Sequence, residues 1–231
     1  MNDKGIDFSK MPDQAIGVIT TPATFFRTMP RDGGFIDPMV FAIAMSLAAA
    51  LIQIVLGLIG LGQAGMTTMA ATGFFAIIMV PIFVLVGSFI GAAIAYVIWR
   101  FLGSDQNYET AFRCVAYMTA IMPLTALISA IPYLGTLIHV AWVFWLMIIA
   151  STEVHGIRYK TAQLVFGIIG AIIAIISISN EYATRHFREN FEQFSKQFGQ
   201  DMENKSPEEL GQAVGEFLKG LENANQKEQP E

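Results

Sequence analysis

The stretch that decides the fold is "IPYLGTLIHVAWVFWLMIIASTEVHGIRYK", residues 131–160. It opens with a short turn, continues as an uncharged apolar block from Leu134 to Thr152, and ends in a polar patch that holds Glu153, His155, Arg158 and Lys160. A helix that crosses about 30 Å of hydrocarbon at 1.5 Å per residue needs about 20 mostly apolar residues. The block therefore predicts a membrane-spanning helix. Trp142 and Trp145 lie deep in it, where we expect them to pack inside a bundle.

The rest of the chain repeats this pattern. Of 231 residues, 54% are hydrophobic and 14% are charged, whereas an ordinary soluble domain has about 25% charged residues. A water-soluble core of this size could not hide so much apolar surface. Four further blocks have spanning length: Pro38–Leu61, Gly73–Phe101, Thr110–Ile131 and Ala162–Ser179. The sequence therefore predicts an all-α integral membrane protein with five transmembrane helices.

Positive charges orient the predicted spans. The N-terminal segment carries four Lys or Arg residues, and the successive connections carry none, two, none and two. Because Lys and Arg are retained on the cytoplasmic side, this alternation predicts a cytoplasmic N-terminus. Five spans then place the C-terminal tail outside, although Arg185 and Arg188, just after the last span, favour the opposite side.

The two polar ends have amphipathic character. Residues 1–35 form an N-terminal segment whose apolar residues and Arg27 predict a helix on the inner leaflet, beginning near Pro22. After the span domain (36–180) comes an acidic tail, because residues 181–231 hold 11 of the 19 acids and 6 of the 14 bases. A helical face repeats there at Phe187, Phe191, Phe194 and Phe198. A capped second helix starts at Ser206 within the predicted tail (181–222), and residues 223–231 are predicted to be disordered.

Six side chains are candidates for binding: Arg113, His139, Glu153, His155, Arg158 and Lys160. A histidine inside a span is a functional candidate by default, but a neutral His139 bonded to a neighbouring helix is the competing interpretation. The Glu-x-His spacing of the patch differs from the His-Glu-x-x-His of zinc hydrolases. We find no catalytic motif and predict no catalytic residue, metal or cofactor. The single Cys114 is interpreted as a packing residue, and no basic, aromatic-rich cluster indicates nucleic-acid binding.

Three segments together resemble a known family. They are "TPATFFRTMPRDGGFIDPM" from Thr21, "FLGSDQNYETAFRCVAYMTAIMP" from Phe101, and the "IPYLG…HGIRYKTA" region from Ile131. Their order resembles the bacterial branch of the Yip (Ypt-interacting protein) domain family over about Thr21 to Ser179. The resemblance implies a five-helix membrane domain with a cytoplasmic N-terminus, in the bacterial cytoplasmic membrane. Eukaryotic members bind small GTPases, but the associated acidic N-terminal motif is not visible here. His155, Gly156 and Lys160 look like a family signature to which no chemistry is assigned.

Three functional hypotheses follow. The first is a non-enzymatic scaffold or adaptor in the bilayer, whose tail binds another membrane protein or a second copy of the chain. The second is a transporter or lipid-handling protein with a cavity near His139, formed with the help of kinks at Pro81 and Pro123. The third is an intramembrane enzyme centred on Glu153, His155 and Arg158.

Overall fold

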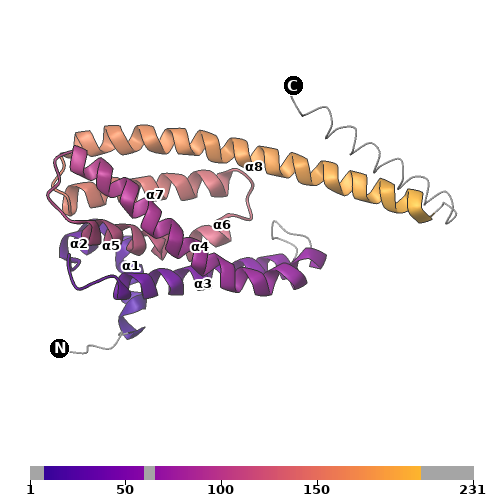
Figure 1. Ribbon diagram of the computed structural model, residues 1–231, viewed down its shortest axis with the longest axis horizontal. Helices are drawn as coiled ribbons and strands as arrows, with labels where there is room; N and C mark the ends of the chain where they lie inside the picture. The colour runs from indigo at the N-terminus through magenta and orange to yellow at the C-terminus, as the bar shows by residue number, and fades with distance from the viewer. Residues whose placement is uncertain (1–7, 60–65, 204–231) are drawn as a thin grey trace, which may run out of the picture. The chain divides into compact units, whose positions relative to one another are not determined.

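The computed structural model describes residues 8–59 and 66–203, and all the regular elements in them are helical (Figure 1). After a 3-10 turn at Phe8–Lys10, the α-helices are α1 (Met11–Thr20), α2 (Pro22–Thr28), α3 (Ile36–Leu58), α4 (Met66–Phe101), α5 (Tyr108–Met118), α6 (Met122–Ile128), α7 (Leu134–Glu153) and α8 (Tyr159–Glu203). Five stretches are long and apolar enough to cross a membrane: Ile36–Leu58, Ile77–Phe101, Tyr108–Ile128, Leu134–Glu153 and Tyr159–Phe191. The predicted five-span, all-helical architecture is confirmed.

The third span is broken near its middle. Helix α5 ends at Met118, a 3-10 turn η2 covers Thr119–Ile121, and α6 begins at Met122 with Pro123 in its first turn. Proline lacks a backbone N–H and favours the first turn of a helix, so it marks where a new helix starts. By contrast, α4 continues through Pro81.

A tight turn joins the third and fourth spans, as the short "PYLG" connection predicts. Tyr133 adopts a positive φ of 59° just before α7 begins. Gly135, two residues later, lies against the end of α6, because a Cβ on Gly135 would be 2.7 Å from the carbonyl oxygen of Ile128. The hairpin therefore depends on a residue without a side chain at this position.

The broken third span is the most enclosed of the five, and it is also the least hydrophobic. Phe112, Cys114 and Ile121 on this span are fully buried. Few of the spanning residues of α4 and α8 are buried in the protein, and these two spans are strongly apolar. This is the arrangement expected in a bilayer, where helices that face lipid must be apolar all round and an enclosed helix can carry polar residues.

The N-terminal helices pack onto the bundle at the end where α4 meets α5 and α7 meets α8 (Figure 1). Helix α2 begins at Pro22 as predicted. However, Phe26 on α2 and Val18 on α1 are fully buried in the protein core, whereas Ile16 is exposed. The segment is therefore built into the domain, and only part of its apolar surface is available to a membrane surface.

One expectation about the tryptophans is wrong. Trp142 packs against the core, but the side chain of Trp145 is 44% exposed on the outside of α7. Both residues are in the same apolar block, and hydropathy alone does not say which face of a spanning helix is turned toward its neighbours.

The chain divides into two units, residues 1–178 and 179–231. In the second unit, the structure describes only the part of α8 that runs from Ser179 to Glu203. Three predictions lie outside the described residues: the helix from Ser206, the disorder at 223–231 and the connection around Gln63. The side chains of Phe194 and Phe198 are not described either.

Candidate functional site

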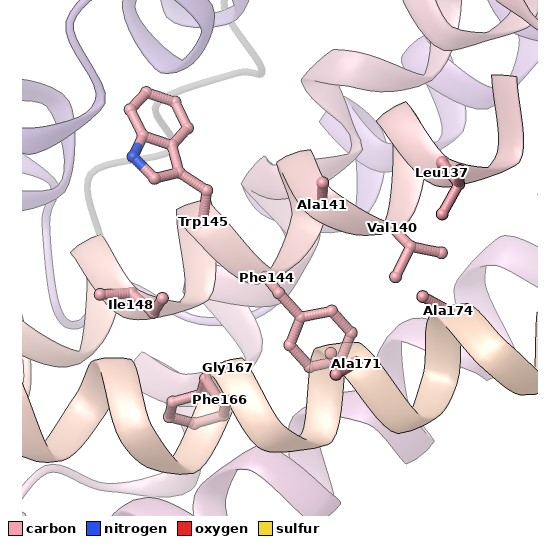
Figure 2. Close-up of a pocket in the computed structure, with 11 residues that line it drawn as sticks. Leu137, Val140, Ala141, Phe144, Trp145, Ile148, Phe166, Gly167, Ala171 and Ala174 are labelled. Carbon is pink, nitrogen blue, oxygen red and sulfur yellow. The ribbon is translucent and has the colours of Figure 1, made fainter. Parts of the chain in front are cut away.

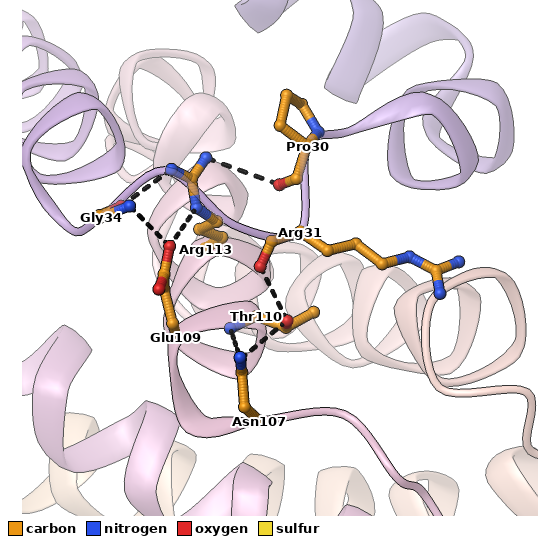
Figure 3. Close-up of polar contacts among 7 residues, drawn as sticks. All are labelled: Pro30, Arg31, Gly34, Asn107, Glu109, Thr110 and Arg113. Carbon is orange, nitrogen blue, oxygen red and sulfur yellow. Dashed lines mark hydrogen bonds and ion pairs between the residues drawn. The ribbon is translucent and has the colours of Figure 1, made fainter. Parts of the chain in front are cut away.

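Arg113 is a buried arginine that ties the N-terminal segment to α5 (Figure 3). Its side chain is 2% exposed. Its Nη2 donates to the carbonyl of Gly34 at 2.8 Å, its Nη1 to that of Pro30 at 3.5 Å, and its Nε lies 3.4 Å from Glu109 Oε1. The same carboxylate oxygen accepts from the Gly34 N–H at 2.6 Å. The guanidinium is thus used inside the protein, and it has a structural role.

The start of α5 adds a second tie to the same loop. The side chain of Asn107 caps the helix by accepting from the Thr110 N–H at 2.9 Å. The hydroxyl of Thr110 lies 2.9 Å from the carbonyl oxygen of Arg31. The side chain of Arg31 points away from the Arg113 cluster, and it is exposed (Figure 3).

His155 is buried against an aromatic ring just beyond the end of α7. Its imidazole stacks on Trp99 with 3.8 Å between ring centroids, and its Nδ1 lies 2.7 Å from Ser104 Oγ. The indole N–H of Trp99 donates to Ser151 Oγ at 2.7 Å. Burial, together with the positive charge of Arg31, lowers the pKa of His155 to about 3. The ring is therefore neutral at physiological pH and joins three segments of the chain.

Glu153 has a different partner from His155. It accepts from Arg27 Nε at 2.7 Å, and this hydrogen bond and charge raise the pKa of Arg27. Arg158 and Lys160 are exposed. The polar patch after the fourth span therefore has three parts: Glu153 pairs with α2, His155 is buried against Trp99, and Arg158 and Lys160 are exposed. These side chains do not converge on one point.

His139, inside the fourth span, bonds to a neighbouring helix as the structural interpretation expected. Its Nδ1 lies 3.1 Å from Thr125 Oγ1 of α6. His139 also lines a groove of about 330 Å³ between α4, α5 and α7, whose other walls include Gly87, Ser88 and Thr119. His139 thus lies at a mainly apolar groove with a few polar groups, in the place where the second hypothesis requires a cavity.

A second groove, of about 310 Å³, lies between α7 and the first part of α8 (Figure 2). Its walls are apolar, and small residues of α8 such as Gly167 and Ala171 form one side of it. Gly170 brings the two helices close together, since a Cβ there would be 2.8 Å from the ring of Phe144. This groove offers no polar side chain other than the indole of Trp145.

Two of the four phenylalanines predicted to form a partner face are described in the second unit. Phe187 is 73% exposed and Phe191 is 60% exposed, and their rings stack with centroids 6.3 Å apart. Nearby positions on the helix are polar, including Arg185, whose guanidinium pairs with Glu181 at 2.6 Å. The apolar pair thus stands out on an otherwise polar stretch of α8.

Sequence reasoning missed the partners of the candidate residues. Glu109, Ser104, Trp99 and Arg27 are the groups that satisfy Arg113, His155 and Glu153. One local signal existed, because Glu109 and Arg113 are four residues apart on a predicted helix, which favours an ion pair. The other contacts join residues that are far apart in the sequence, and no spacing rule identifies them.

Among the side chains that the structure describes, no three histidine, cysteine, aspartate or glutamate residues gather as a metal ion would require. Residues 16–179 match a protein family described as the Yip1 domain. No curated protein and no solved structure matches the chain.

Proposed function

The chain belongs to the Yip1 domain family, and on this premise we propose that it is a non-enzymatic adaptor that binds a protein partner, or a second copy of itself, through the Phe187–Phe191 face. We place it in the bacterial cytoplasmic membrane with the N-terminus inside, since its basic residues alternate between connections as the positive-inside rule requires.

The exposed phenylalanine pair is the observation that carries this proposal. A large apolar side chain on a polar helix is costly to leave in water, and contiguous apolar exposure marks interaction surfaces. The titratable side chains support a non-enzymatic role, because Arg113, Glu153 and His155 are each engaged by structural partners. A catalytic group needs a substrate within reach, and these three are turned toward different parts of the fold.

The test is the double variant Phe187→Ser/Phe191→Ser in the full chain, reconstituted in nanodiscs. We expect its affinity for the partner, or for a second copy, to fall about thirtyfold, as truncation of an aromatic anchor does. Pull-down with mass spectrometry detects a different protein, and light scattering detects a second copy. Glu189→Ser/Gln193→Ser, off the phenylalanine face, is the matched control. Unchanged partners and unchanged mass in the phenylalanine variant would contradict the proposal.

The groove lined by His139 favours a second candidate function, namely the binding and movement of lipid or another apolar small molecule. Ligand sites are typically apolar concavities of about 300–1,000 Å³ with a few placed polar groups, and this groove has both features. Gly87→Leu should fill it, because a Cβ on Gly87 would meet no atom within 4 Å. The measurement is the rate at which a fluorescent lipid exchanges between vesicles that contain the wild-type protein or the Gly87→Leu variant. Equal rates for the two proteins would exclude the second candidate function.

A further inference from the structure

We infer that the groove between α4, α5 and α7 takes a neutral amphiphile of the long-chain alcohol class, whose hydroxyl donates a hydrogen bond to Nε2 of His139. This inference rests on the second candidate function and adds the chemistry of the ligand. It follows from the direction of the hydrogen bonds around His139, from the shape of the groove beside this residue, and from the location of His139 within a membrane-spanning helix.

The tautomer of His139 is set by Thr125. The Thr125 hydroxyl lies 3.1 Å from the carbonyl oxygen of Ile121, one turn earlier, and 3.2 Å from that of Met122. A threonine hydroxyl in a helix usually donates to the carbonyl three or four residues earlier, and we assign the single hydroxyl hydrogen of Thr125 to one of these two carbonyls. With this assignment, Thr125 Oγ1 accepts from the Nδ1–H of His139 at 3.1 Å. A neutral imidazole protonated at Nδ1 carries a lone pair on Nε2.

That lone pair has no donor within the described part of the chain, and His139 lines the groove. In hydrocarbon an unsatisfied polar atom costs free energy, so an O–H or N–H group in the groove is stabilised there. A charged amine would be expelled by the apolar walls, which include Val143 and Met147. A neutral hydroxyl meets both requirements.

Two further features of the groove fit an alcohol. Ser88 is 5% exposed and lines the same groove, so the α4 wall of the groove also carries a hydroxyl group. Gly87, one residue before it, leaves open space where any other residue would place a Cβ. The groove can therefore hold a polar head beside His139 and an apolar chain along α4.

The experiment compares two photoreactive probes with the full chain in phosphatidylcholine nanodiscs. One is a sixteen-carbon alcohol that bears a diazirine, and the other is its methyl ether, which keeps the oxygen but has no donor. We expect the alcohol to label peptides that contain residues 84–91, 115–122 or 139–147, about tenfold more efficiently than the ether, as the loss of one hydrogen bond predicts. Labelling is normalised to that of α3, which lines neither groove, and this corrects for the partition of each probe into the bilayer.

The variants separate the histidine from the groove. His139→Phe keeps a ring and should make the two probes equal by weakening only the alcohol, whereas Gly87→Leu should abolish both signals. Gly167→Leu, which enters open space in the other groove, is the matched control and should leave both unchanged. Equal labelling of the wild-type groove by alcohol and ether would overturn the inference while leaving lipid handling intact. Absence of labelling at these peptides would overturn both.

Discussion

Arg113 shows how a spanning helix can carry a charge without a ligand. The guanidinium is almost fully buried, yet two carbonyls and one carboxylate surround it. A buried charge is tolerated only when paired and hydrogen-bonded. Gly33 permits this arrangement, because its φ is +113° and a Cβ there would lie 3.1 Å from Arg113 Nη2.

Replacing Arg113 by Met should destabilise the protein by about 2–3 kcal/mol, since the partly exposed Glu109 would lose its cationic partner and the carbonyls of Pro30 and Gly34 would lose a donor. Hydrogen exchange in the segment around Gly34 should accelerate in the same variant. The double variant Arg113→Met/Glu109→Gln should recover part of the loss, because no uncompensated charge remains. Arg31→Gln is the control, as its side chain is exposed. Thermal unfolding in detergent that is equal for wild type and Arg113→Met would refute the structural role.

His155 makes stability depend on pH with a defined sign. Its pKa is about 3 in the folded protein and about 6.5 when unfolded. Between these values the unfolded chain binds a proton that the folded chain does not, so stability falls as pH falls from 6.5 toward 3, by up to about 1.4 kcal/mol per pH unit. The melting temperature of wild type should therefore drop more between pH 7 and pH 4.5 than that of His155→Gln. Parallel pH profiles would show that His155 is not buried as a neutral ring.

At the level of helices, the number and approximate positions of the spans were predictable, because each span must be an apolar block at least as long as the bilayer is thick. The end of the fifth was not, since α8 continues past Ser179 to Glu203. Pro123 predicted the break in the third span for an equally local reason. The faces of the helices were not predictable in this way. Trp145 looks like Trp142 in sequence but is turned outward. The sequence names Arg113 as a binding candidate but does not indicate that its guanidinium contacts the carbonyls of Pro30 and Gly34. The face that a helix turns toward the protein is determined by contacts between segments far apart in the sequence, and hydropathy does not indicate these contacts.

The turn between α6 and α7 gives a prediction about helix placement. Gly135→Ala should destabilise the domain by about 1–3 kcal/mol, because the added Cβ would meet backbone atoms of Ile128 and Ser129 at 2.7 Å and backbone moves less readily than a side chain. Gly87→Ala, which enters open space, serves as the control. The measurement is the midpoint of thermal unfolding in one detergent. A Gly135→Ala midpoint within error of wild type would mean that the two helices are not held this closely.

For the whole molecule, the decisive property is how often the chain crosses the bilayer and in which direction. The amphipathic ends can meet a partner only on the side to which the spans deliver them. The protein offers a direct test because its single cysteine, Cys114, is fully buried and should not react with a membrane-impermeant maleimide. Because Cys114 does not react, the labelling of a second cysteine introduced at an exposed position shows on which side of the membrane that position lies.

We expect Asp105→Cys, between α4 and α5, to be protected in intact cells, because that connection is cytoplasmic in the predicted topology. Pro132→Cys, between α6 and α7, and Asn190→Cys, in the tail, should be labelled from outside. All three positions are exposed, and acidic residues influence topology little, so replacing Asp105 should not invert the chain. Labelling after lysis checks that each cysteine is reactive. If Asp105→Cys and Pro132→Cys respond alike, the third span does not cross the bilayer. If Asn190→Cys is protected together with Asp105→Cys while Pro132→Cys is labelled, the bases Arg185 and Arg188 determine the side of the tail, and a partner of the phenylalanine face must be sought in the cytoplasm.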